Sequence, residues 1–542
     1  MLSDFMTSSA FGFVALAVPL LHYGFLWSRR SGPIPIRLND DAFYYLTIAR
    51  NIVAGLGSTF DGLGPTNGYH PIWLGLLIPL AAVAPSDDWL IGSVYVLNSL
   101  LWIAAVMLLA ALGRSMGCRR EMVFALPVLI WYGATWGGRG HYLFFTGLEI
   151  GLTIVLLLLI VWRALAIDLY GKAVRWQSLI GLGALFGLLV LTRLDTVFIA
   201  AVLIGLLALN SARLKGSLAR GIAAALLLAA PVGLALGLYV AFNLAVAGTP
   251  LAISGQAKSL NAPWFSWINL HLILAHGFFH KLPIFAGMFL LPLSMATALV
   301  SRQCEERDKT ARLLVAALVI AFVLQALAWW ALYIPCDIRP YYFYVTPVAA
   351  SIAVPRLVSQ IGGRIGIHPL LPSFLATSFT LFLVLHLLWP PEWTTHRPEP
   401  SLNAYDHSRV VSEWLRTNTP PNTRYAMADH SGVTGFLLKR PVFQLEGLVN
   451  TPGYLRDMAA GKVDTDYLLD RGISVYINSA PGGLLHDATN CFIAPVFGGD
   501  WPQPRIRLCP KDLMWQGENS DSIVTVWRLQ RRPRTEQGSV RR

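Results

Sequence analysis

Long apolar runs separated by short basic connectors constrain this chain more than any other feature. Eleven runs qualify as candidate membrane helices: residues 10–27, 89–112, 122–136, 147–162, 179–191, 196–209, 221–245, 283–300, 313–333, 341–355 and 370–389. A helix needs about 20 apolar residues to cross a bilayer, and fewer where part of the protein lies at the interface. Only 13% of the residues are charged, against about 25% in an ordinary soluble domain. The sequence therefore predicts a multi-pass membrane protein and excludes collagen-like, disordered and small disulfide-stabilised classes.

The distribution of Lys and Arg predicts the orientation. Alternate connectors are rich in basic residues, beginning with residues 114–120, whereas the opposite connectors carry them singly. Because loops rich in Lys and Arg stay in the cytoplasm, we expect a cytoplasmic N-terminus, with Arg29 and Arg30 as the exception to the pattern. The alternation requires the short apolar run 71–83 to be an interfacial helix. The net charge of +12 then reflects topology, and no nucleic-acid partner is expected.

The composition divides the chain into three parts. Residues 1–389 form the predicted transmembrane domain, which includes an external loop at about residues 30–88. Residues 390–530 read as an external α/β domain, with a helix at 403–416 and strands at 424–428, 474–478 and 523–529. Residues 531–542 form a basic flexible tail. Cys491 and Cys509 both lie in the external domain, and whether they form a disulfide is left open.

Two adjacent carboxylates, Asp40 and Asp41, follow the first apolar run and begin a predicted helix at residues 41–53. Such a pair is costly beside lipid, and it is useful where a hydroxyl must be deprotonated or a cation held. A structural explanation is equally good, since an Asp at the start of a helix satisfies free backbone N–H groups.

Five more charged residues, Glu149, Arg193, Asp195, Lys258 and Arg339, are expected on the same external side. Each has an ordinary explanation: a first-turn carboxylate for Glu149, a structural ion pair for Arg193 with Asp195, and snorkelling for the other two. Two short helices that turn at residues 192–195 would keep charges out of the bilayer centre. The convergence of acids and bases predicts a site that holds an anionic headgroup beside a general base.

Four motifs in order resemble those of the GT-C membrane glycosyltransferases: Asp40-Asp41-Ala42-Phe43, Asn67-Gly68-Tyr69-His70-Pro71, Thr146-Gly147-Leu148-Glu149 and Thr192-Arg193-Leu194-Asp195. The resemblance covers residues 10–389 and is nearest to the bacterial arabinofuranosyltransferase-like and protein O-mannosyltransferase-like branch. It implies a mainly α fold: a bundle of about eleven transmembrane helices with external juxtamembrane helices and a C-terminal external α/β domain. Tyr44-Tyr45 and the context of His70-Pro71 depart from the arabinosyl members, so the sugar is not assigned.

The resemblance implies transfer of a sugar, with inversion, from a polyprenyl-phosphate donor to a hydroxyl of a glycan, lipid or protein acceptor. The reaction would occur at the extracytoplasmic face of the bacterial inner membrane. The implied residues are catalytic carboxylates (Asp40, Asp41, Glu149), groups that bind the donor phosphate (Lys258, Arg339, Arg193) and groups that bind substrate (Tyr44, Tyr45, Asn67, Tyr69, His70, Asp195). One Asp of the pair would be the general base, and the sequence does not choose between them.

A metal and two other function classes stay open. Asp40, Asp41 and Glu149 offer hard oxygen ligands for a divalent cation (Mg²⁺, Mn²⁺ or Ca²⁺), although a direct base needs none. A transporter or flippase of lipid-linked glycans would use the same charges to line a path, but such proteins usually show two related halves, which this sequence lacks. A non-catalytic envelope-assembly protein would not need carboxylates at the membrane face. Sugar transfer is the preferred hypothesis.

Overall fold

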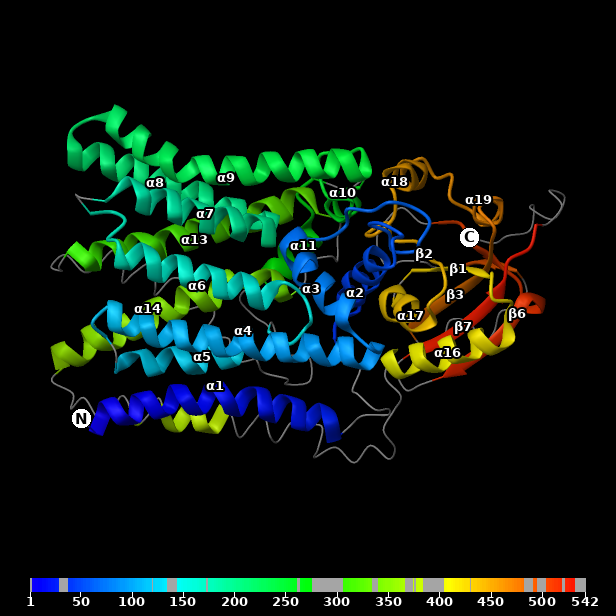
Figure 1. The fold of residues 1–542 in the computed structure, drawn as a ribbon, viewed down its shortest axis with the longest axis horizontal. Coiled ribbons are helices and arrows are strands. Elements are labelled where there is room, and N and C mark those ends of the chain that lie inside the picture. The colour runs from blue at the N-terminus through cyan, green and yellow to red at the C-terminus, as the bar shows by residue number, and fades with distance from the viewer. Residues whose placement is uncertain are drawn as a thin grey trace.

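The computed structural model describes residues 2–28, 38–118, 120–133, 144–171, 174–260, 264–274, 306–333, 340–365, 374, 377–383, 404–428, 430–481, 491–494, 504–518 and 522–531. Figure 1 shows a helical bundle with a smaller α/β domain at one end. The bundle and the elements at its end comprise α1 (Leu2–Ser28), α2 (Asp40–Val53), α3 (Pro71–Val83), α4 (Asp87–Ser115), η1 (Glu121–Phe124), α5 (Ala125–Gly133), α6 (Ile150–Ala166), α7 (Trp176–Thr192), η2 (Leu194–Thr196), α8 (Val197–Lys215), α9 (Leu218–Ala247), α10 (Ile253–Ser259), α11 (Trp267–Leu274), α13 (Glu306–Leu332), η4 (Pro340–Phe343) and α14 (Val345–Ile365).

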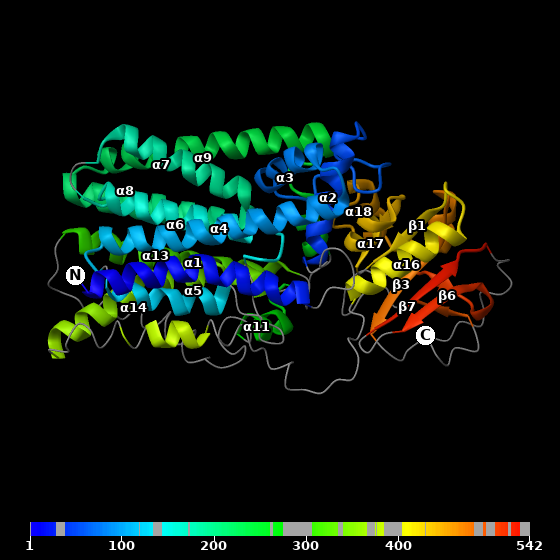
Figure 2. The ribbon, with the colours of Figure 1, turned by 60° about the horizontal axis from the view of Figure 1, so that its bottom comes forward.

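The long apolar helices lie side by side in both ribbon views (Figures 1 and 2). Among the described residues, four helical segments are long and apolar enough to cross a membrane: Asp87–Ser115, Leu194–Leu214, Leu218–Ala247 and Lys309–Leu332. Six further apolar helices are shorter. The chain is therefore a multi-pass membrane protein. The predicted spans 283–300 and most of 370–389 lie outside the described residues, so the predicted total of eleven stays a prediction.

Two elements of the bundle begin and end close to where the sequence predicts, and the interfacial position of residues 71–83 stays a prediction. Residues 71–83 form a separate helix, α3. Its first residue is Pro71, and the fixed φ angle of proline suits the first position of a helix. Helix α3 lies with α2 at the end of the bundle that faces the α/β domain (Figure 1). The chain also turns at residues 192–196, where α7 ends and η2 leads into α8. Arg193 and Asp195 thus stand at the end of a helical hairpin.

The C-terminal domain is a mixed sheet covered by helices. Its elements are α16 (Ala404–Asn418), β1 (Arg424–Met427), α17 (Ser431–Leu438), β2 (Val442–Gln444), α18 (Pro452–Ala459), α19 (Thr465–Asp470), β3 (Ile473–Pro481), β4 (Phe492–Ile493), β5 (Arg507–Leu508), η6 (Pro510–Asp512), β6 (Leu513–Glu518) and β7 (Ser522–Arg528). The sheet order is β2-β1-β3-β7-β6, with parallel pairing among β2, β1 and β3 and antiparallel pairing beyond.

Alternation along the strands produces two cores, because successive side chains of a strand point to opposite faces. Tyr425 and Met427 pack on one face with Val411 of α16. Ala426 and Tyr476 pack on the other face with apolar residues of α18. The predicted helix and the three predicted strands correspond to α16, β1, β3 and β7.

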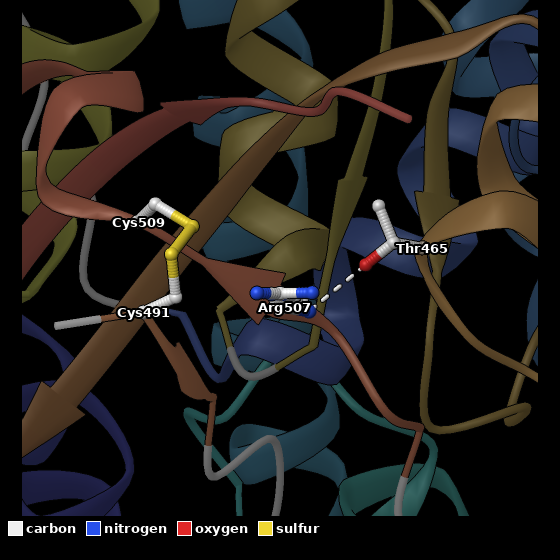
Figure 3. Close-up of a disulfide and its surroundings, with 4 residues drawn as sticks. All are labelled: Thr465, Cys491, Arg507 and Cys509. Atoms are coloured by element: carbon white, nitrogen blue, oxygen red, sulfur yellow. Dashed lines mark hydrogen bonds between the residues drawn. A yellow bond between two sulfur atoms is a disulfide. The ribbon is translucent and has the colours of Figure 1, made fainter. Parts of the chain in front are cut away.

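A disulfide joins Cys491, directly before β4, to Cys509, directly after β5, and so links the two strands of this short pair. Figure 3 shows it beside Arg507, whose backbone N–H donates to the hydroxyl of Thr465 at 2.8 Å. The pairing that the sequence leaves open is therefore made. Disulfides of this kind persist in oxidising compartments, which agrees with an external location for the domain.

Candidate active site

The first carboxylate of the Asp pair holds the α/β domain to the bundle. Asp40 is the first residue of α2, and its two carboxylate oxygens accept hydrogen bonds from the backbone N–H groups of Gly432 (3.1 Å) and Val433 (2.8 Å). Those amides begin α17, where the helix dipole favours a negative charge. Gly432 is required, because a Cβ added there would collide with the backbone oxygen of Asp40. Asp40 lies outside the lining of the central cavity described below.

The helix cap of α2 differs from the prediction. Asn39, rather than an aspartate, is the N-cap, and its side-chain oxygen accepts the N–H of Asp41 at 3.0 Å. The expectation that an Asp caps this helix is wrong, because the asparagine before the pair already satisfies the free amide. Both aspartates are thereby available for contacts outside their own helix.

A central cavity of about 160 Å³ lies at the end of the bundle, where α2, α10 and the α7–η2 turn meet the α/β domain. Nine predicted site residues line it: Asp41, Tyr44, Tyr45, Tyr69, His70, Glu149, Arg193, Asp195 and Lys258. Leu448 of the α/β domain closes part of the wall. Residues that lie far apart in the sequence thus line one cavity. Arg339 lies outside the described residues.

The carboxylate of Asp41 and the ammonium of Lys258 each contact one of two adjacent tyrosines in the cavity. The hydroxyl of Tyr341 donates to Asp41 over 3.5 Å, a long hydrogen bond. The ammonium of Lys258 donates to the hydroxyl of Tyr342 at 2.5 Å and lies 5.3 Å from the centre of that ring. The two tyrosine rings touch edge to face, 4.9 Å apart. A carboxylate and a cation therefore face the same small space through adjacent side chains.

Arg193 is held between two carboxylates. Its Nε and one terminal nitrogen donate to both oxygens of Asp195, at 3.0 and 2.8 Å, and its other terminal nitrogen donates to Glu149 at 2.8 Å. Gln325 and Tyr344 complete the set by donating to Asp195. Arg193 is 5% exposed and Glu149 is 3% exposed. The predicted ion pair is thus a buried network, and the guanidinium predicted to bind phosphate is directed at carboxylates instead.

Tyr45 and His70 extend the network toward the cavity. The hydroxyl of Tyr45 donates to Glu149 at 3.1 Å and accepts the backbone N–H of His70 at 3.3 Å. The His70 Nε2 lies 3.6 Å from a Glu149 oxygen. Burial lowers the pKa of His70 below its ordinary value, against the pull of Glu149, and burial raises the pKa of Tyr45 well above its usual range. At neutral pH the imidazole is therefore uncharged and the phenol keeps its proton.

Asn67 does not reach the cavity. Its amide donates to the carbonyl of Leu251 at 3.1 Å and accepts the N–H of Ile253 at 3.0 Å, and the side chain is 1% exposed. The prediction that Asn67 binds substrate is therefore corrected: this amide fixes the start of α10, the helix that carries Lys258. The position of Asn67 beside other polar residues in one motif suggested that it binds substrate, whereas its hydrogen bonds hold the loop in place.

Tyr44 and Tyr69 line the cavity while their hydroxyls bind protein groups. Tyr44 shares a hydrogen bond with Ser431 of the α/β domain at 2.9 Å, and Tyr69 shares one with Ser58 at 2.7 Å. Their rings therefore offer apolar surface to a ligand.

Four side chains that contribute to the cavity and its network were not predicted from the sequence: Gln325, Tyr341, Tyr342 and Tyr344. The clustered aromatic residues at 341–344 were a usable signal, because hydroxyl-bearing rings gather where charges must be held at a membrane face. Gln325 gave another signal, since a lone amide in an apolar membrane helix needs a partner inside the bundle.

The three carboxylates considered for a metal do not gather into a metal site. No group of three His, Cys, Asp or Glu side chains in the described part of the chain is arranged to hold a metal ion. Asp40 binds the amides of α17, and Glu149 binds Arg193 and Tyr45. The residues present therefore do not fit a metal ion, and we derive no step through one.

Comparison with solved structures decides the fold. ArnT from Cupriavidus metallidurans, solved bound to undecaprenyl phosphate, matches with a TM-score of 0.55 at 12% identity, over 95% of this chain and 97% of ArnT. An oligosaccharyltransferase from Archaeoglobus fulgidus, tethered to an acceptor peptide with the NVT sequon, matches with a TM-score of 0.51 at 14% identity, over 87% of this chain and 68% of that one. The chain has the fold that these two proteins share.

The likeness to these proteins is one of structure, at 12–14% sequence identity. No family model matches the chain, and no curated protein matches it either. The same archaeal oligosaccharyltransferase was also solved with zinc and sulfate, with a TM-score of 0.50 at 15% identity, over 87% of this chain and 68% of that one. The similarity covers the fold alone, so the arabinofuranosyltransferase-like or O-mannosyltransferase-like branch stays a prediction.

Proposed function

We propose that this chain is a membrane glycosyltransferase that moves a sugar from a polyprenyl-phosphate donor to an acceptor hydroxyl, with inversion. The observation that carries the proposal is the presence of Asp41 and Lys258 in the lining of one cavity at the end of a bundle with the fold of ArnT. ArnT, which shares the fold, was solved with undecaprenyl phosphate bound. A lipid donor keeps its tail in the bilayer, so its phosphate and sugar would enter a cavity at the end of the helical bundle.

Asp41 is the proposed general base. The acceptor hydroxyl gives its proton to the Asp41 carboxylate as its oxygen attacks the anomeric carbon of the donor. The new carbon–oxygen bond forms on the face opposite the phosphate, the old bond to the phosphate oxygen breaks, and the configuration inverts. A positioned base of this kind contributes about 10²–10⁴ in rate. Asp40 is excluded from this role, because both its oxygens bind backbone amides of α17.

Lys258 is the proposed partner of the leaving phosphate. Negative charge develops on the phosphate oxygen as the sugar departs, and a cation placed in advance stabilises it. Lys258 approaches the cavity from α10, and its contact with Tyr342 keeps the ammonium aimed inward. Arg193 is a weaker candidate, since its donors already face Asp195 and Glu149. In this proposal the Glu149–Arg193–Asp195 network holds the wall of the cavity in place.

The proposed location is the extracytoplasmic face of the bacterial inner membrane, with the N-terminus in the cytoplasm. The basic connectors on one side support that orientation. The disulfide in the α/β domain supports it independently, because such bonds persist outside the reducing cytoplasm.

The decisive experiment measures donor turnover in purified protein reconstituted in nanodiscs. A panel of short-chain polyprenyl-phosphate sugars is added, and mass spectrometry follows the release of free polyprenyl phosphate. We expect release by the wild type and by Asp40→Asn, and release slower by about 10²–10⁴ by Asp41→Asn. Asp40→Asn is the matched control, since it makes the same substitution one residue away. Donor binding without Asp41-dependent release, in the presence of a broad set of acceptors, would favour a transporter of lipid-linked glycans.

A further inference from the structure

A second, larger cavity of about 360 Å³ lies between the loop that follows α2 and the α/β domain. Asp61 and Gly64 contribute from the loop, and Arg424, Asp457 and Arg471 contribute from the domain. Two aromatic rings, Tyr454 and Tyr467, complete the relevant wall, with Asn450 beside them. None of these residues takes part in the central cavity, and the reaction proposed above uses none of them.

The two cavities lie along one seam between the loop and the domain. Gly68 and Leu448 line the central cavity, whereas Gly64 and Thr451 line the second one. The seam is tight: a Cβ added at Gly64 would lie 2.7 Å from the methyl group of Thr451, and one added at Gly68 would collide with the carbonyl of Leu448. Four residues span at most about 14 Å of extended chain, so the two cavities are near neighbours on either side of this closed contact.

The side chains of the second cavity are fixed in place before any ligand arrives. The Arg471 guanidinium stacks on the Tyr467 ring at 3.3 Å and lies 3.6 Å from Asp457. The hydroxyl of Tyr467 donates to Asp457 at 3.0 Å. On the opposite side, Arg424 donates to the backbone oxygen of Arg471 at 3.1 Å. A cavity with side chains held by such contacts loses little freedom when it binds, which favours affinity.

The balance of charge identifies the kind of ligand. Two carboxylates and two guanidinium groups share the wall with the rings of Tyr454 and Tyr467 and of two further aromatic residues. A phosphate would meet Asp61 and Asp457, and an ammonium would meet the two arginines, so neither kind of ion is favoured. A neutral polyol suits both signs of charge, because each hydroxyl can donate to a carboxylate and accept from a guanidinium. The apolar face of a sugar ring also packs on aromatic surface.

From this geometry we propose that the second cavity is a subsite for an internal sugar of a glycan acceptor. The inference rests on the transferase function proposed above and names its acceptor class. The acceptor glycan passes over the closed seam, with its terminal hydroxyl beside Asp41 and a preceding sugar between Arg424 and Asp457. The enzyme would therefore extend or decorate an existing oligosaccharide.

The first test measures binding of neutral trisaccharides to the full chain in nanodiscs, by saturation-transfer NMR without any donor. Mannotriose, arabinotriose, galactotriose and maltotriose serve as probes. We expect the best of them to bind the wild type, and its Kd to rise at least tenfold in both Asp457→Asn and Arg424→Gln. The control is Asp466→Asn, an exposed change on α19 outside the cavity lining, which should leave the Kd unchanged. Thermal melts of each variant establish that it is folded.

The second test is kinetic and separates this inference from the proposed function. With the bound glycan as acceptor, the two cavity variants should raise KM at least tenfold and leave kcat within about twofold, as expected for lost ground-state binding. Asp41→Asn should bind the trisaccharide normally and transfer sugar more slowly by about 10²–10⁴. Absence of trisaccharide binding to the wild type overturns the subsite even where Asp41-dependent transfer occurs. Binding of an Asn-Val-Thr peptide that depends on Arg424 and Asp457 overturns it in favour of a peptide acceptor. Sugar binding without any Asp41-dependent release would instead refute the transferase function and leave a carbohydrate site.

Discussion

Asp40 and Asp41 are consecutive residues whose carboxylates have different surroundings. Asp40 accepts two backbone hydrogen bonds from the start of α17, whereas Asp41 lines the central cavity and receives the hydroxyl of Tyr341. Docking of the α/β domain and the proposed chemistry are thus only one residue apart on the same helix. A shift of the domain would move the proposed base directly.

Replacement of the proposed base should remove the chemical step. We expect Asp41→Asn to slow single-turnover sugar transfer by about 10²–10⁴, the usual contribution of a general base, with donor binding within about twofold of the wild type. Quench-flow with mass spectrometry measures the rate, and a labelled donor measures binding. Full activity of Asp41→Asn would show that another group takes the proton.

Loss of the other carboxylate should weaken the domain contact. Asp40→Ala removes the acceptor for two amides at the start of α17. Caps of this kind contribute about 0.5–2 kcal/mol, so the free energy of domain docking should fall by a similar amount. Limited proteolysis should then cut the variant faster than Asp40→Asn, which keeps one acceptor oxygen. Equal proteolysis of wild type and Asp40→Ala would contradict the docking role.

The positive charge of Lys258 should affect the rate more than the shape of its side chain does. Lys258→Gln removes the cation that faces the central cavity, and loss of a group that stabilises charge in the transition state typically costs about 10²–10³ in kcat. Lys258→Arg keeps the charge and should recover a large part of the rate. A variant Lys258→Gln with unchanged kcat and a raised donor KM would mean that the lysine only binds the donor.

The buried network should be sensitive to the loss of its cation. Arg193→Met leaves Glu149 and Asp195 close together without the guanidinium between them. Removal of one partner of a buried ion pair costs about 3–5 kcal/mol, so the melting temperature of the purified variant should fall clearly. Arg193→Lys restores the positive charge without the planar guanidinium, so its melting temperature should lie between those of the wild type and Arg193→Met. A wild-type melting temperature for Arg193→Met would show that the carboxylates find another partner.

His70 should make stability depend on pH in a defined direction. Burial holds the pKa of His70 below its ordinary value of 6.5. Above pH 6.5 the imidazole is neutral in the folded and the unfolded chain, so it adds no pH dependence. Below pH 6.5 the imidazole of the unfolded chain takes up a proton that the folded chain resists. The free energy of unfolding therefore decreases as the pH is lowered, until the pH reaches the lowered pKa of the folded chain.

The measurement is the Tm of wild type and His70→Gln from about pH 7.5 to about pH 5. We expect the wild type to lose more stability than the variant as the pH falls through this range. Parallel curves for the two proteins would show that the imidazole is protonated equally in both states.

Much of the fold was predictable because it follows from local pattern. Apolar runs identified α4, α9 and α13, and strand alternation identified β1, β3 and β7. The turn at Arg193 was predictable as well, since charge at the bilayer centre is costly. Helix caps were less predictable. Asn39 and Asp40 are both residue types that favour the N-cap position, and only the folded chain shows that Asn39 caps α2.

The candidate site was predictable as a set of residues and not as a set of roles. Charge and motif order brought nine residues to the central cavity. Asn67 was misassigned, because its partners Leu251 and Ile253 lie on a loop and helix that the motif gives no sign of. The different surroundings of Asp40 and Asp41 could not be predicted either, because they depend on backbone amides of the α/β domain.

The bond between Asp40 and Gly432 also sets the order in which the protein can be assembled. These residues are 392 positions apart, and the wall that Leu448 provides comes later still. At bacterial and eukaryotic synthesis speeds of about 5–20 residues per second, the ribosome needs about 20–80 s to make the intervening chain. During that interval Asp41 already exists without its enclosing wall. The nascent protein would therefore be inserted in the membrane well before its cavity is complete.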